Sequence, residues 1–126
     1  MLLRDSLGNQ CSGATAAGID HFDHGLRLLQ CYIGDPVSVA DEAIAAAPDM
    51  IMAHALRAWL LLLSTEAQFL PVARASWEAA SQLPATDRER GHLDAIGHLL
   101  QGRWHDAARV LEDVSIAHPR DALALL

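Results

Sequence analysis

The chain has 126 residues, of which 52% are hydrophobic, 20% charged and only 5% aromatic. A chain of this length and apolar content can bury a core, which argues against disorder and predicts one domain or a part of one. Nine basic residues, all of them arginine, stand against sixteen acidic ones, and the formal net charge is −7. Because the arginines form no cluster, we expect neither nucleic acid nor an anionic membrane surface as a partner.

The compartment is inferred from three further features. The first residues lack the basic start and the long apolar core of a signal peptide. The longest apolar stretch, residues 51–63, contains His54 and Arg57 and is shorter than the ~20 residues that a bilayer needs. The two cysteines, Cys11 and Cys31, are too few for a disulfide scaffold. We therefore expect a soluble, cytoplasmic protein with free thiols.

The order of apolar residues predicts a helical chain. Alanine and leucine dominate, and residues that favour strands are scarce, so we expect an all-α protein. Residues 1–14 show no sustained period and are predicted to form an extended lead-in. Six later stretches repeat apolar side chains every three to four positions, as amphipathic helices do. The expected helices lie within residues 15–33, 35–48, 49–62, 65–83, 86–100 and 104–118.

Several of these helices begin with a capping signal. Asp35 precedes a proline, which suits an N-cap followed by the first helical position. Residues 65–68 and 86–89 both have the form of a capping box, with threonine first and glutamine or glutamate fourth. Asp49 is expected to cap the third helix. Asp121 precedes a last apolar pattern over residues 122–126, which is about one helical turn long.

The helices repeat in pairs. Pro48, Pro84 and Pro119 close successive pairs at intervals of 36 and 35 residues. A triplet in the second helix of one pair recurs 34 positions later: Ala73, Trp77 and Ala80 become Ala107, Leu111 and Val114. A period near 34, built as helix–turn–helix with a closing proline, is typical of tetratricopeptide repeats.

We therefore expect an all-α fold of tetratricopeptide-type repeats stacked as a right-handed α-solenoid. One helical-repeat domain is expected over residues 15–126, with about three repeats and the start of a fourth. The expected repeats cover residues 15–48, 49–84 and 85–119, and a truncated next helix covers 120–126. The alternative fold is a six-helix bundle, in which helices far apart in sequence would be in contact.

Small and aromatic residues add to the expected packing. Small residues occupy the positions where paired helices must cross, and larger ones would force the backbones apart. These positions are Gly25, Ala58, Ala73, Ala95 and Ala107. The three tryptophans, Trp59, Trp77 and Trp104, fall at helical spacing and are expected in the core.

Two stretches carry a resemblance to a known family. The first combines Arg88, Glu89, His92, Ala95, Gly102, Ala107 and Leu111 with the run His118-Pro119-x-Asp121-x-Leu123-Ala124-Leu125. The second joins Ala47-Pro48-Asp49 to Met52, His54 and the leucines at 60–63. Both resemble the tetratricopeptide repeat protein 38 family and its bacterial members. The resemblance implies that the chain is the N-terminal portion of a longer helical-repeat protein, and it brings no catalytic residues.

No residue pattern predicts a catalytic site, a metal or a cofactor. His21 and His24 lie three positions apart on one expected helix, but no third metal ligand is placed beside them. Cys11 lies in a loop of small residues that lacks a preceding strand and a nucleophile motif. Pairing of Cys11 with a distant histidine stays an alternative, because such partners meet in space and not in sequence.

The first helix of each pair is expected to line the concave groove of the solenoid. This groove face is mostly apolar, so we expect it to be covered by later repeats or to accept an apolar helix or a second copy. Its expected residues are Phe22, Leu26, Met52, Trp59, Leu62, Glu89, His92 and Ile96.

Two functions are compatible with this sequence. The first is a non-catalytic helical-repeat scaffold, a protein-interaction module that binds a protein partner or itself. The alternative is part of an enzyme or of a small-molecule-binding protein, whose pocket a C-terminal portion completes. The lack of a chemical motif favours the first.

Overall fold

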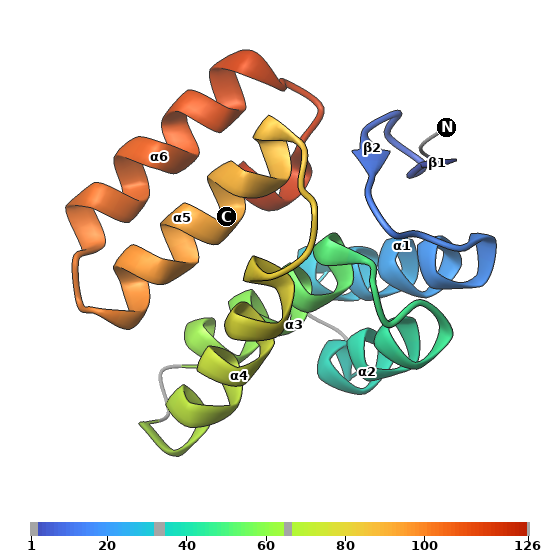
Figure 1. Cartoon of the computed structure of the whole chain (residues 1–126), viewed down its shortest axis with the longest axis horizontal. Helices are drawn as coiled ribbons and strands as arrows, with labels where there is room; N and C mark the ends of the chain where they lie inside the picture. Colours follow the sequence, from blue (N-terminus) through green and yellow to red (C-terminus); the bar gives the residue numbers. More distant parts are fainter. Residues whose placement is uncertain (1–2, 32–34, 65–66, 126) are drawn as a thin grey trace.

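The computed structural model describes residues 3–31, 35–64 and 67–125. Within these ranges the chain is mostly helical, and the expected all-α class is confirmed (Figure 1). The α-helices are α1 Ala16–Cys31, α2 Pro36–Ala46, α3 Ile51–Leu63, α4 Leu70–Ser81, α5 Asp87–Leu100 and α6 Trp104–Ala117. The shorter elements are the antiparallel strands β1 Leu3–Arg4 and β2 Gln10–Cys11 and the 3-10 turns η1 Ala67–Phe69 and η2 Ala122–Leu125. None of the described helices is long and apolar enough to cross a membrane.

The helix starts agree in part with the capping signals. Asp35 caps α2 by accepting a hydrogen bond from the Ser38 amide, and Thr86 and Glu89 form the expected capping box at α5. The expected cap at Asp49 is wrong, because Met50 is the N-cap of α3 and makes no side-chain capping bond. The backbone turns just before it, where the Met50 amide donates to the Ala47 carbonyl. The expected capping box over residues 65–68 lies partly outside the described residues, and α4 begins at Leu70.

The helices pack as three hairpins. α1 pairs with α2, α3 with α4, and α5 with α6. α3 also contacts α1 and α2, and α5 also contacts α3 and α4. Each hairpin therefore lies mainly against the hairpin next to it in sequence (Figure 1).

Small residues allow these helices to approach closely. All five small residues expected at helix crossings are buried: Gly25, Ala58, Ala73, Ala95 and Ala107. Gly91 adds a sixth close approach, because a Cβ atom there would lie 2.4 Å from Cγ2 of Val114. A side chain at position 91 would therefore separate α5 from α6.

The described part of the N-terminal lead-in, residues 3–14, is a compact loop. Asp5 accepts hydrogen bonds from the amides of Leu7 and Asn9, at 3.0 and 2.9 Å, and so closes the turn between β1 and β2. Gly13 has a φ of +70°, and a Cβ atom there would lie 1.8 Å from the Asp49 carbonyl oxygen. Only glycine lets the lead-in pass this close to the corner between α2 and α3.

The tryptophans differ in their burial. Trp59 is 4% exposed and lies in the core, whereas Trp77 is half-buried and donates a hydrogen bond from Nε1 to the Leu93 carbonyl. Trp104 is 60% exposed, so its expected place in the core is wrong. It stands in the first turn of α6, on a side that no described helix covers.

Candidate functional site

The expected groove face is buried throughout. None of its eight residues is more than 8% exposed, although all eight were expected to line the concave groove of the solenoid. These residues are Phe22, Leu26, Met52, Trp59, Leu62, Glu89, His92 and Ile96. In the described chain this face is therefore the centre of the molecule.

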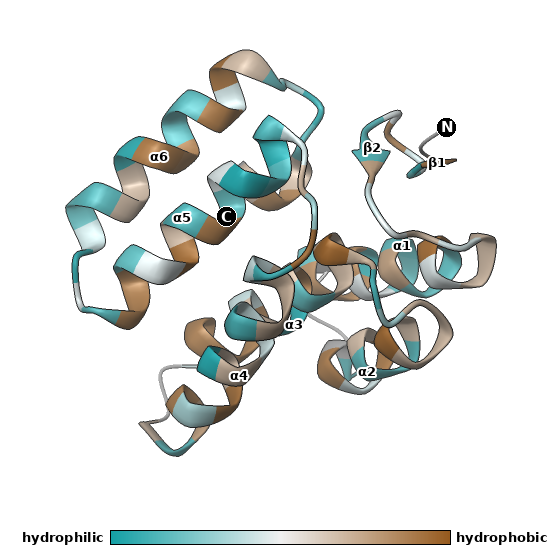
Figure 2. Ribbon diagram, viewed as in Figure 1, coloured by the Kyte–Doolittle hydropathy of each residue, from teal (hydrophilic) through white to brown (hydrophobic). Residues whose placement is uncertain are grey.

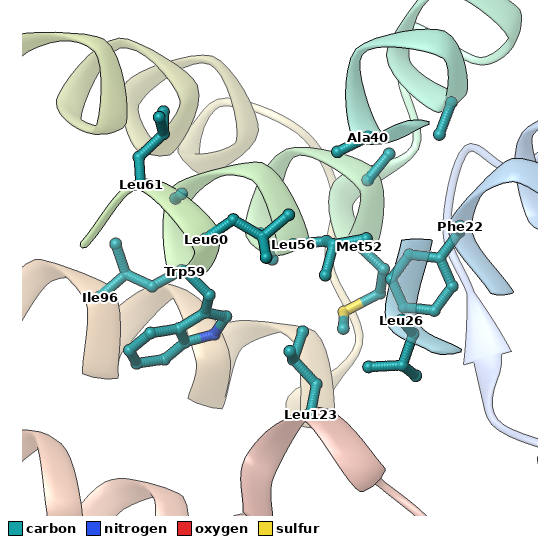
Figure 3. Close-up of a cluster of buried hydrophobic side chains, with 14 of the residues drawn as sticks. Phe22, Leu26, Ala40, Met52, Leu56, Trp59, Leu60, Leu61, Ile96 and Leu123 are labelled. Atoms are coloured by element: carbon teal, nitrogen blue, oxygen red, sulfur yellow. The ribbon is translucent and has the colours of Figure 1, made fainter. Parts of the chain in front are cut away.

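The C-terminal turn helps to cover it. Leu123, in η2, is 2% exposed and belongs to the same buried cluster as the groove residues. Figure 3 shows its side chain beside Leu26, Met52 and Trp59, which come from α1 and α3. The segment after α6 thus fills part of the face that the first helices of the hairpins present.

A buried carboxylate anchors this turn. Asp121 is 2% exposed, and its Oδ2 atom lies 2.7 Å from Nε2 of His92 and 3.0 Å from Nη1 of Arg88. Its Oδ1 atom accepts a hydrogen bond from the Ala124 amide at 3.2 Å. Burial alone would raise the pKa of Asp121, but the hydrogen bond from His92 and the charge of Arg88 outweigh it and lower the pKa to about 2.

His92 is fixed on both sides of its ring. Its Nδ1 atom accepts a hydrogen bond from Nε1 of Trp59 at 3.2 Å, and the two rings meet edge to face. An indole N–H can only donate, so the histidine hydrogen lies on Nε2 and is directed at Asp121. The imidazole therefore has no free nitrogen for proton transfer to another group.

The first turns of α5 also hold the N-terminal lead-in. Arg88 donates from Nη2 to the Gln10 carbonyl at 2.8 Å, and Glu89 accepts from the Ser12 amide at 2.8 Å. The other carboxylate oxygen of Glu89 completes the capping box with Thr86. One stretch of α5 thus binds both the lead-in and the C-terminal turn.

Cys11 is close to this cluster but is poorly suited to nucleophilic attack. Its Sγ atom is 3.9 Å from Nη2 of Arg88 and 3.6 Å from the Asn9 carbonyl. Burial, followed by the charge of Asp5, raises the pKa of the thiol to about 12. The thiol is protonated at neutral pH, whereas a nucleophilic cysteine must be a thiolate. The alternative of Cys11 with a distant histidine gains no support from this geometry.

The histidines considered as metal ligands lie elsewhere. His21 on α1 is 3.2 Å from Glu42 of α2 through Nδ1, and His24 is exposed. Among the residues that the structure describes, no three histidine, cysteine, aspartate or glutamate side chains are grouped as a metal site.

A polar cleft of about 410 Å³ lies between the lead-in and the start of α5. Every described residue around it is polar or glycine: Arg4, Gly8, Asn9, Gln10, Thr86, Asp87, Arg88 and His118. The cleft therefore lacks the apolar walls that usually enclose a small organic ligand.

A second candidate surface lies on the outside of α6. Trp104, Ala108 and Leu111 follow each other at spacings of four and three, which places them on one side of the helix. We call these three residues the outer flank. Trp104 is 60% exposed and Ala108 is exposed, whereas Leu111 is half-buried and packs in part against the core. Figure 2 shows hydrophobic positions along α6 between hydrophilic ones.

The sequence carried one signal for the buried polar cluster of Arg88, His92 and Asp121. Arg88 and His92 share one side of an amphipathic helix with Ala95 and Leu99, so two polar side chains lie on the side that must be buried. Buried charges need partners, but the sequence did not reveal that the partners are Asp121 and the lead-in. Leu123 was missed as a core residue for the same reason.

No family model matches the chain, and no solved structure matches it. Its function is therefore inferred from the residues described above.

Proposed function

We propose that the protein is a non-catalytic helical-repeat module, similar to the tetratricopeptide repeat protein 38 family, that binds another protein through the outer flank of α6. The partner we propose is a second copy of the chain. The observation that carries this proposal is Trp104, which is 60% exposed beside the exposed Ala108 on an otherwise well-packed helix pair.

The repeat architecture is supported by the pattern of helix contacts. The principal contacts of the described helices join the two members of a hairpin or two successive hairpins. A six-helix bundle would instead place α1 against α5 or α6 as a principal contact. The three prolines near the hairpin ends and the buried small residues at the crossings fit the same arrangement.

A non-catalytic role is supported by the state of the buried polar groups. Both ring nitrogens of His92 have hydrogen-bond partners, Asp121 is held by two donors, and the Cys11 thiol keeps its proton. Each of these groups is committed to structure. The cluster holds the two ends of the described chain in place. Arg88 and His92 do so at the C-terminal end by binding the carboxylate of Asp121.

The outer flank is identified by comparing α6 with α4. Trp77 on α4 packs on α5, where its ring lies 3.1 Å from the Cβ position of Gly97. Leu111 occupies the equivalent place on α6, 34 positions later. There the following element is η2, which is only four residues long, and Trp104 at the other end of the flank is 60% exposed. A helix seated on the flank would cover α6 as α5 covers α4.

The chemistry of the flank suits a second copy in antiparallel orientation. A pairing centred on Ala108 would bring Trp104 of one copy beside Leu111 of the other, and alanine at the centre allows a close approach. His105 and Glu112 border the flank and would face each other across the pair. The net charge of −7 opposes association, but salt screens it beyond ~8 Å.

Sedimentation equilibrium tests this proposal. We expect the chain to form a reversible dimer with a dissociation constant below about 100 μM, an affinity that a small interface can provide. Trp104→Glu and Ala108→Glu should each restore the monomer, because both side chains are exposed in the single chain. Ile116→Glu is the matched control, because Ile116 is 72% exposed on α6 but lies outside the flank. A monomer at every concentration, or an equal effect of Ile116→Glu, would contradict the proposal.

A further inference from the structure

The buried groove face, together with the start of α5, holds the C-terminal turn at two points. Asp121 binds the side chains of Arg88 and His92, and Leu123, two residues later, enters the apolar cluster. A charged anchor and an apolar anchor at a fixed separation are the two elements by which many proteins recognise a short peptide.

The polar half of this site is held by contacts other than those with Asp121. Arg88 and His92 are four residues apart on α5 and so lie on the same side of the helix. Arg88 is oriented by the Gln10 carbonyl, and His92 by Trp59. Two donors are therefore aimed at one point by contacts that do not involve Asp121, and such preorganisation favours binding.

The apolar half comes from two other helices. Leu26 on α1 and Met52 and Trp59 on α3 lie beside the side chain of Leu123 in Figure 3, and all four belong to one buried cluster. Leu26, Met52 and Trp59 are each 5% exposed or less. A leucine that leaves this place would uncover a mainly hydrophobic pit.

The site also selects the conformation of its occupant. Asp121 accepts the Ala124 amide through Oδ1 while Oδ2 binds Arg88 and His92. The carboxylate therefore caps the turn and forms the ion pair at the same time. Aspartate is short enough to cap its own turn in this way, which favours it over glutamate.

We propose that the concave face is a recognition site for an aspartate-x-leucine turn, and that a partner protein with this sequence feature binds there in place of residues 121–124. This site is separate from the outer flank of α6, and the two proposals stand or fall independently. The chain's own turn competes at an effective concentration in the millimolar range, because only a short segment joins it to α6. A partner segment therefore binds strongly only when the chain's own turn is weakened.

Fluorescence anisotropy with a labelled peptide tests the proposal. The peptide has the sequence of residues 118–124, with blocked ends. We expect it to bind the variant Asp121→Asn/Leu123→Ala at least about tenfold more tightly than the wild-type chain, since the variant's own turn competes poorly. Peptides that carry Asp121→Asn or Leu123→Ala should each bind the same variant at least about tenfold more weakly.

A matched pair of variants in the chain that binds the peptide tests the role of Arg88. Arg88→Gln, added to the double variant, should weaken peptide binding, whereas Arg90→Gln should not, because Arg90 is exposed on the same helix. Circular dichroism checks that each variant is folded. If the double variant unfolds, Leu123→Ala alone replaces it, and if that also unfolds, the peptide is titrated into the wild-type chain at millimolar concentration by NMR.

Three outcomes would overturn the proposal. The first is a folded variant, or the wild-type chain at millimolar peptide, that binds no peptide. The second is binding that is indifferent to the aspartate and leucine of the peptide. The third is a wild-type dimer that Leu123→Ala abolishes and Trp104→Glu leaves intact, since a second copy would then exchange its turn and be the occupant.

Discussion

Arg88 and Asp121 place two opposite charges inside the molecule, where their side chains are only 4% and 2% exposed. Burial of an ion pair costs desolvation energy that the attraction between the charges only partly offsets, whereas removal of one partner leaves an uncompensated charge. Here the remaining hydrogen-bonding capacity is met by the Gln10 carbonyl, by His92 and by the Ala124 amide. The pair therefore fixes the two ends of the described chain to α5, and each charge depends on the other for its partner.

The pH dependence of stability tests this assignment at the residue level. Asp121 has a pKa of about 2 in the folded chain, against an ordinary value of 3.8. A carboxylate whose pKa is lowered by folding stabilises the native state above pH ~4, and this contribution is lost as the pH falls towards 2. The difference corresponds to about 2 kcal/mol.

We therefore expect the free energy of unfolding of the wild-type chain to fall by about 2 kcal/mol more than that of Asp121→Asn between pH 5 and pH 2. Urea titrations at several pH values measure this. Asp113→Asn, which removes an exposed carboxylate on α6, should follow the wild-type curve. Equal pH dependence of wild type and Asp121→Asn would mean that the carboxylate is not held by Arg88 and His92.

At the level of elements, the hairpins depend on small residues between their helices. Ala107 is 3% exposed and faces α5, and Gly91 on α5 lies against Val114 of α6. Both positions let the α5–α6 backbones approach, and the equivalent Ala73 on α4 is fully buried. The 34-residue spacing of Ala73 and Ala107 thus reflects the same packing requirement in two hairpins.

Overpacking should disrupt the third hairpin. We expect Ala107→Leu to lower the free energy of unfolding by ~1–3 kcal/mol, because three extra carbon atoms must be placed between α5 and α6. Ala108→Leu is the control, since Ala108 is exposed on the same helix and should change stability by less than about 0.5 kcal/mol. Urea unfolding at low protein concentration compares them. Equal effects would show that Ala107 is not at a close crossing.

The elements show which features the sequence could predict. Apolar periodicity and capping residues such as Asp35 and Thr86 depend on neighbours within four residues, so they located the helices well. The prediction of Asp49 as an N-cap was wrong because a residue type that caps helices can equally form a turn. The prediction of Trp104 as a core residue was wrong because helical spacing does not reveal which side of a helix remains uncovered. The contact of Arg88 with Asp121 spans 33 residues, and no local pattern encodes it.

At the level of the whole molecule, the inside is closed and the outside of α6 is open. The lead-in and the C-terminal turn meet on α5 through Arg88, although Gln10 and Asp121 lie at opposite ends of the described chain. Asn9 adds a direct contact between the two segments, because its side-chain amide donates to the Arg120 carbonyl at 3.0 Å. The hairpins therefore form a closed unit, and the two most exposed large apolar side chains of the described residues, Trp104 and Ile116, lie on α6.

The closed inner face is the central claim, because the burial of the groove residues and the recognition of an aspartate-x-leucine turn both depend on it. The most direct test is a ¹³C-edited NOESY spectrum of the wild-type chain. We predict cross-peaks from the methyl groups of Leu123 to the indole protons of Trp59 and to the methyl group of Met52. A helical chain with a dispersed spectrum that lacks these cross-peaks would contradict the account, since the C-terminal turn would then lie outside the concave face.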